Sequence, residues 1–94
     1  MSSVSDEDAL RRAAVRLVDF VFGDDMSYFD SLPPDVEVEI GSPLGMVAVA
    51  LEEGHEVSEL RDAARLLHSC TAGVLSSIPR ELFDMISELR LFAR

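Results

Sequence analysis

The chain has 94 residues, of which 48% are hydrophobic, and its 18 acidic and 8 basic residues give a formal net charge of −10. This length and hydrophobic content predict a single domain with one modest core rather than a disordered chain. The negative charge repels nucleic-acid phosphates and anionic membranes and attracts basic surfaces.

The N-terminal region predicts a short disordered tail over residues 1–4, followed by a single helical domain over 5–94. Ser5 is a good N-cap, and acidic residues follow it in the first turn, where the helix dipole favours negative charge. Gly23 is expected to end this helix. Its apolar side chains recur at helical spacing, at Leu10, Ala13, Ala14, Leu17 and Val21.

Residues 24–34 are expected to connect the first helix to the rest of the domain. Tyr28, Phe29 and Leu32 can form one short amphipathic turn, with Asp25 or Ser27 as its cap. The Pro33-Pro34 pair should end that turn, because a proline disfavours the helical conformation of the residue before it.

Residues 36–40 alternate apolar and acidic side chains, a period of two that predicts an extended segment. A lone strand needs a partner, and the apolar run over 46–51 is one candidate, which would give a β-hairpin over 36–51. In the competing interpretation, Ser42 caps a helix that begins at Pro43 and runs to Glu53. Ser42-Pro43 is a helix start signal and Gly54 is a helix stop signal, and both favour the helical interpretation.

After Gly54 the chain predicts two further helices. One apolar stripe runs from Leu60 to Val74, and a second runs from Leu82 to Phe92, with a break around Pro79. The predicted fold is therefore mainly α, a compact bundle of about four helices with one short extended segment near 36–40. An α+β fold with a 36–51 hairpin is the minor alternative.

Groups suited to catalysis are few and scattered. Cys70 is the only cysteine, which excludes an intrachain disulfide, and it lies on an apolar stripe two residues from His68, too far around a helix for contact. His55 is expected to have a surface or capping role, and the acids of residues 24–30 lack an EF-hand pattern. No phosphate-binding loop is present. We predict no enzymatic activity, cofactor or metal; an enzyme would need a distant pairing such as His68 with Asp24 or Asp25.

Residues 46–67 bear a limited similarity in spacing to a helix-turn-helix, with Ala50 in the first helix, Gly54 in the turn and Leu60 in the second helix. In a DNA-binding regulator of this kind, Arg61 and Arg65 would make the contacts. The adverse net charge removes the counterion-release contribution to affinity, so nucleic acid is not the expected partner.

The acidic balance favours a protein–protein interaction module or regulator instead, acting on a protein with a basic surface, where rows of carboxylates could mimic a phosphate backbone. A phage or mobile-element accessory protein in a cytoplasmic setting fits the size, charge and thiol content, and self-association would bury surplus apolar surface. No segment is long and apolar enough to span a membrane. The predicted binding residues are Glu37, Glu39, Glu52, Glu53, Glu56 and Glu59 on an acidic face, with Phe20, Phe22, Tyr28 and Phe29 as apolar contacts.

Overall fold

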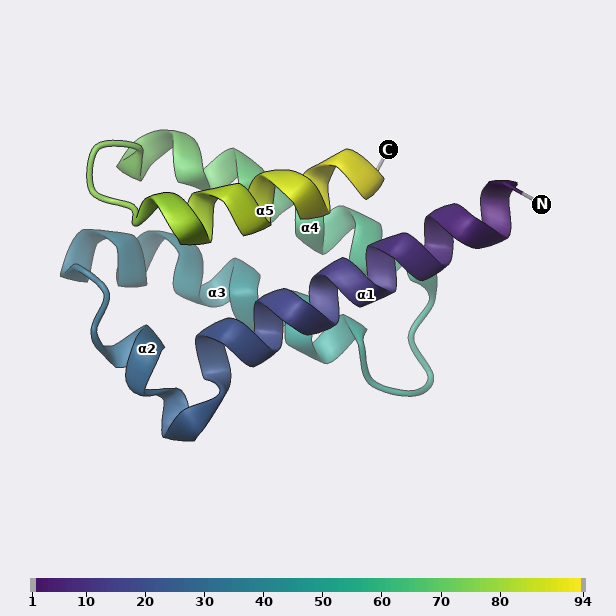
Figure 1. Cartoon of the computed structure of the whole chain (residues 1–94), viewed down its shortest axis with the longest axis horizontal. Coiled ribbons are helices and arrows are strands. Elements are labelled where there is room, and N and C mark those ends of the chain that lie inside the picture. Colours follow the sequence, from purple (N-terminus) through teal and green to yellow (C-terminus); the bar gives the residue numbers. More distant parts are fainter. Residues whose placement is uncertain (1, 94) are drawn as a thin grey trace.

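A computed structural model describes residues 2–93, with side chains described for 7–23 and 25–93. It shows the predicted mainly α bundle, and no strand occurs among the described residues (Figure 1). The elements in chain order are α1 (Ser2–Phe22), the 3-10 turn η1 (Asp24–Met26), α2 (Ser27–Asp30), α3 (Pro34–Ala50), α4 (Val57–Thr71), the 3-10 turn η2 (Ala72–Val74) and α5 (Arg80–Phe92). No helix in the described part of the chain has the length and apolar character needed to cross a membrane.

Helix α1 begins at Ser2, three residues before the predicted cap at Ser5, and ends before Gly23 as expected. The predicted tail over residues 1–4 stays a prediction, and Met1 lies outside the described residues. The apolar stripe of α1 faces inward, since Leu10, Leu17 and Val21 are completely buried. Burying side chains of this size contributes about 1.5–3 kcal/mol each, so this stripe fixes α1 on the bundle.

The connection between α1 and α3 contains the predicted short helix, α2, but neither predicted cap. Its N-cap position is Met26, whose φ of 64° lies in the left-handed region, and no side chain caps the helix. Asp25 has a φ of 61° as well. Two successive left-handed residues turn the chain sharply, which lets α2 fold back on α1.

The predicted extended segment at 36–40, and with it the alternative hairpin over 36–51, is wrong: both ranges lie in α3. Val36 and Ile40 are fully buried, whereas Val38 between them is 80% exposed. A strand would place all three on one face, but a helix turns Val38 away from the others. The apparent alternation arose because one apolar residue lies on the solvent side of a helix.

The boundaries of α3 also differ from the competing helical interpretation. Pro34 stands in the first turn, where its missing N–H costs nothing, so the Pro-Pro pair begins this helix rather than only ending the previous segment. Pro43, predicted as a helix start, lies inside α3. The helix ends at Ala50, before the predicted Glu53, and a turn that includes Gly54 at φ 92° leads to α4.

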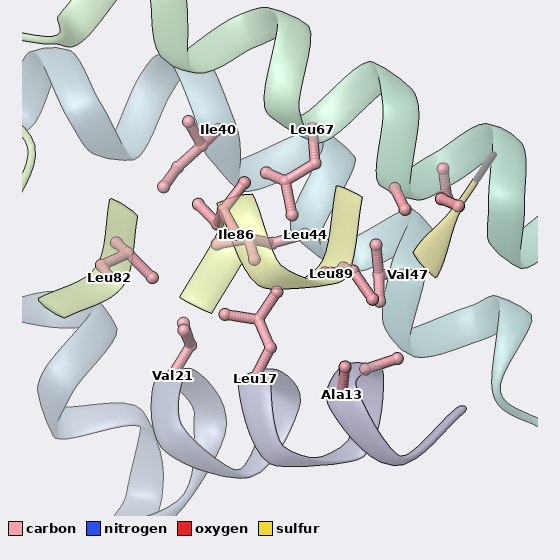
Figure 2. Close-up of a cluster of buried hydrophobic side chains, with 14 of the residues drawn as sticks. Ala13, Leu17, Val21, Ile40, Leu44, Val47, Leu67, Leu82, Ile86 and Leu89 are labelled. Carbon is pink, nitrogen blue, oxygen red and sulfur yellow. The ribbon is translucent and has the colours of Figure 1, made fainter. Parts of the chain in front are cut away.

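The four long helices alternate in direction along the chain, so that α3 and α4 form an antiparallel hairpin and α5 lies against both α1 and α4 (Figure 1). Their apolar faces meet in one core. Figure 2 shows the side chains of α1, α3, α4 and α5 that converge there, which include Leu17, Ile40, Leu44, Leu67 and Ile86. All five are completely buried. This shared core positions the outward faces of the helices.

Candidate protein-binding surface

The structure distributes the ten predicted binding residues over three places rather than one. Glu37 and Glu39 lie in the first half of α3, and four glutamates lie around the α3–α4 turn. The aromatic residues lie at the junction of α1 and α2. Whether any of them binds a partner stays a prediction, but their positions decide which of them can act together.

Glu37 and Glu39 do not share a strand face, because both lie on a helix, where residues two apart point in nearly opposite directions. Glu37 is half-buried, while the exposed Glu39 places its carboxylate beside Gly73 in η2, just after α4. At about 1.5 Å of rise per residue, they lie roughly 15–20 Å from the α3–α4 turn. The six glutamates of the predicted acidic face therefore form two separate groups.

The second group, which we call the turn cluster, comprises Glu52, Glu53, Glu56 and Glu59, all exposed. The Glu59 carboxylate accepts a hydrogen bond of 2.9 Å from the backbone N–H of Glu56 and lies 3.2 Å from Nδ1 of His55. The backbone N–H first and His55 second lower the pKa of Glu59 below its ordinary value. Glu56 is the N-cap of α4 and Glu59 its capping-box partner, so these two residues fix the first turn of the helix, while His55 precedes the cap and contacts only the Glu59 side chain.

A groove adjoins the turn cluster on the outer side of the α3–α4 hairpin. It has a volume of about 410 Å³ and is lined by Ser42, Gly45, Met46, Val49, Ala50, His55, Glu59 and Ala63. Met46 and Val49 are 47% and 49% exposed, so two large apolar side chains stand open to solvent beside the carboxylates. The arrangement combines an apolar floor with an acidic end.

The sequence-based site omitted Met46 and Val49, although a signal for them exists. No charged residue occurs between Gly41 and Leu51, although charged residues make up 28% of the chain. A helix that is apolar on all sides is normally covered on all sides. In this domain the other helices cover only the inner side of α3, so the outer side of α3 remains an apolar surface.

The four aromatic residues pack mainly within the domain. The rings of Phe20 and Tyr28 lie 4.4 Å apart, those of Phe22 and Phe29 lie 5.6 Å apart, and these contacts hold α2 on α1. All four are half-buried against the core. They are neither fully buried nor prominently exposed, so their predicted role at an interface stays a prediction.

Of the residues considered for catalysis, His68 and Cys70 pack within the domain, and the side chain of Asp24 lies outside the described residues. The ring of His68 stacks near that of Phe83 on α5, with centroids 6.4 Å apart, while Asp25 lies in η1 in the α1–α3 connection. Cys70 is half-buried against the core. Among the described residues, no group of three or more His, Cys, Asp or Glu side chains could hold a metal ion.

The segment considered for DNA binding forms the antiparallel α3–α4 hairpin (Figure 1). Its second helix, α4, directs Leu60, Ala63, Ala64 and Leu67 into the core. Arg65 is exposed, whereas Arg61 is half-buried. The DNA-binding alternative thus depends on two arginines of unequal exposure beside the negatively charged turn cluster.

Comparison of the chain with protein-family models, with curated proteins and with solved structures gives no match.

Proposed function

We propose that the protein is a protein–protein interaction module, whose α3–α4 groove binds a basic amphipathic segment of another protein. The observation that supports this proposal is a groove whose open apolar floor, at Met46 and Val49, is lined at the same time by Glu59 of the turn cluster. Neither feature alone specifies a partner. Together they match a segment that carries apolar side chains on one face and Lys or Arg on the other.

The two features contribute differently to binding. Apolar side chains that enter the groove remove Met46 and Val49 from water; because these are 47% and 49% exposed, each contributes at most about half of the ~1.5–3 kcal/mol that burying a fully exposed side chain of this kind is worth. The exposed carboxylates attract the partner over longer range and raise the association rate, an effect that salt weakens. The apolar floor therefore supplies most of the affinity, and the turn cluster supplies the selectivity for a basic partner.

The test uses a fluorescently labelled helical peptide of Leu and Lys, with the two residue types on opposite faces, titrated with the protein and followed by anisotropy. The proposal expects saturable binding that weakens as salt rises from about 0.05 to about 0.5 M. The double variant Glu52→Lys with Glu53→Lys should weaken binding about tenfold, a loss of about 1.4 kcal/mol. A matched control, Asp19→Lys with Asp30→Lys, makes the same change in net charge at exposed positions elsewhere and should bind almost normally.

A second pair of variants tests the apolar floor. Val49→Ser should weaken peptide binding, whereas Leu75→Ser should not, because Leu75 is 57% exposed but does not line this groove. Absence of peptide binding, or equal losses in the groove variants and their controls, would overturn the proposal. Binding of duplex DNA that is lost on changing Arg65 would favour the helix-turn-helix alternative instead.

A further inference from the structure

A second groove lies on a different pair of helices and has the opposite charge. It is formed by the middle of α1 and the end of α5, and these two helices lie side by side (Figure 1). The groove has a volume of about 490 Å³ and is lined by Ala9, Arg11, Arg12, Val15, Arg16 and Phe92. Among the side chains that the structure describes, no acidic one lines it, although the chain carries 18 acidic and 8 basic residues. We call it the arginine groove.

The three arginines of this groove differ in what they contact. Nη2 of Arg16 lies 2.6 Å from the Glu88 carboxylate of α5, an ion pair that joins the two helices. Nε of Arg12 donates a hydrogen bond of 3.4 Å to the backbone carbonyl of Asp8. Among the described side chains, no carboxylate lies within ion-pair distance of Arg11 or Arg12. Two guanidinium groups thus retain donors for an external acceptor.

The floor of the groove is apolar. Val15 is 46% exposed, and Phe92 is half-buried against the core at the end of α5. The aliphatic stems of arginines add to such a surface while their charged ends stay in water. The groove therefore presents apolar contact area with guanidinium groups around it, which is the charge-reversed counterpart of the α3–α4 groove.

We propose that the arginine groove binds an acidic amphipathic helix of another protein. Arginine fits this role because its planar guanidinium pairs with a carboxylate through two parallel hydrogen bonds. Apolar side chains of the partner would cover Val15 and Phe92, a contact that a phosphate backbone does not provide.

With two grooves of opposite charge, the protein would join a basic segment at α3–α4 to an acidic segment at α1–α5. This second surface goes beyond the proposed function and does not depend on it. Because the two grooves select peptides of opposite charge, each proposal fails or succeeds in its own measurement.

The test uses a labelled helical peptide of Leu and Glu, titrated with the full chain and followed by anisotropy. Arg11→Glu with Arg12→Glu should weaken its binding at least about tenfold and leave the Leu/Lys peptide unaffected or bound more tightly. The matched control is Arg65→Glu with Arg80→Glu, two exposed arginines outside the groove with the same change in charge, which should preserve binding. Circular dichroism of each variant confirms folding, and Arg11→Gln with Arg12→Gln replaces the reversal if that variant is unfolded.

The apolar part is tested with Val15→Ser, which should also weaken binding of the Leu/Glu peptide, against Leu75→Ser as a control. Three results would overturn the proposal: no binding of the Leu/Glu peptide, equal loss in the arginine variants and their control, or displacement of the peptide by duplex DNA at low salt. The last result would show that the groove recognises phosphate rather than an acidic helix.

Discussion

The substitution Gly45→Ala tests directly whether α3 is a continuous helix through the segment that the sequence pattern divides. Gly45 lies in the interior of α3, and a Cβ added there meets nothing within 4 Å. The substitution therefore creates no clash and changes mainly the backbone entropy. Alanine is favoured over glycine in a helix interior by about 0.8–1.0 kcal/mol, so the free energy of unfolding should rise by about that amount.

In a domain of this size, 1 kcal/mol corresponds to about 4–8 °C in the melting temperature, a shift easily measured by circular dichroism. The control is Gly54→Ala in the α3–α4 turn, where φ is 92°. Because an L-residue with a side chain pays about 1–2 kcal/mol in the left-handed region, this variant should melt at a lower temperature. The two glycine substitutions should thus have opposite signs.

A melting temperature that is unchanged or lower in Gly45→Ala would refute the continuous helix. In a hairpin over 36–51, residue 45 would belong to the connecting loop, and alanine would bring no gain in helix propensity there.

Three further predictions concern the core and two titratable groups. Ile40→Ala should lower the free energy of unfolding by about 2–5 kcal/mol in urea denaturation, because Ile40 is completely buried. Val38→Ala should change it by less than about 0.5 kcal/mol, because Val38 is 80% exposed. Similar losses at both positions would contradict the helix. Burial first and the charge of Glu81 second raise the pKa of Tyr28, so its absorbance titration should have a midpoint above the ordinary value of about 10. The contribution of the neutral phenol to the free energy of unfolding should be complete below pH ~10 and lost as the pH rises through the raised folded pKa. A midpoint at or below 10 would argue against the packing of α2. The pKa of Glu59 is lowered, so the contribution of its carboxylate to stability should be complete above the ordinary glutamate pKa of about 4.3 and lost as the pH falls through the lower folded pKa. Glu59→Gln should reduce this acid dependence in thermal melts between neutral and acidic pH. An unchanged acid dependence would count against the carboxylate contacts.

The candidate surfaces were only partly accessible from the sequence. The glutamates of the turn cluster are adjacent in the chain, so their proximity follows from the sequence alone. Their separation from Glu37 and Glu39 does not, because it depends on whether residues 36–50 are a strand or a helix of roughly 22 Å. The arginine groove could not be foreseen at all, since Phe92 reaches Val15 only when α5 folds back along α1.

The mainly α class follows from the amino-acid sequence alone, because helical periodicity is strong in α1, α4 and α5 and a single amphipathic stripe is enough to specify each of them. The helical conformation of α3, by contrast, depends on tertiary packing. Its apolar side chains lie on both the inner and the outer side, so local periodicity could not distinguish a helix from a strand at Val36, Val38 and Ile40. Only packing against α1 and α4 selects the helical arrangement that buries Val36 and Ile40, and the same packing leaves Met46 and Val49 exposed near the turn cluster.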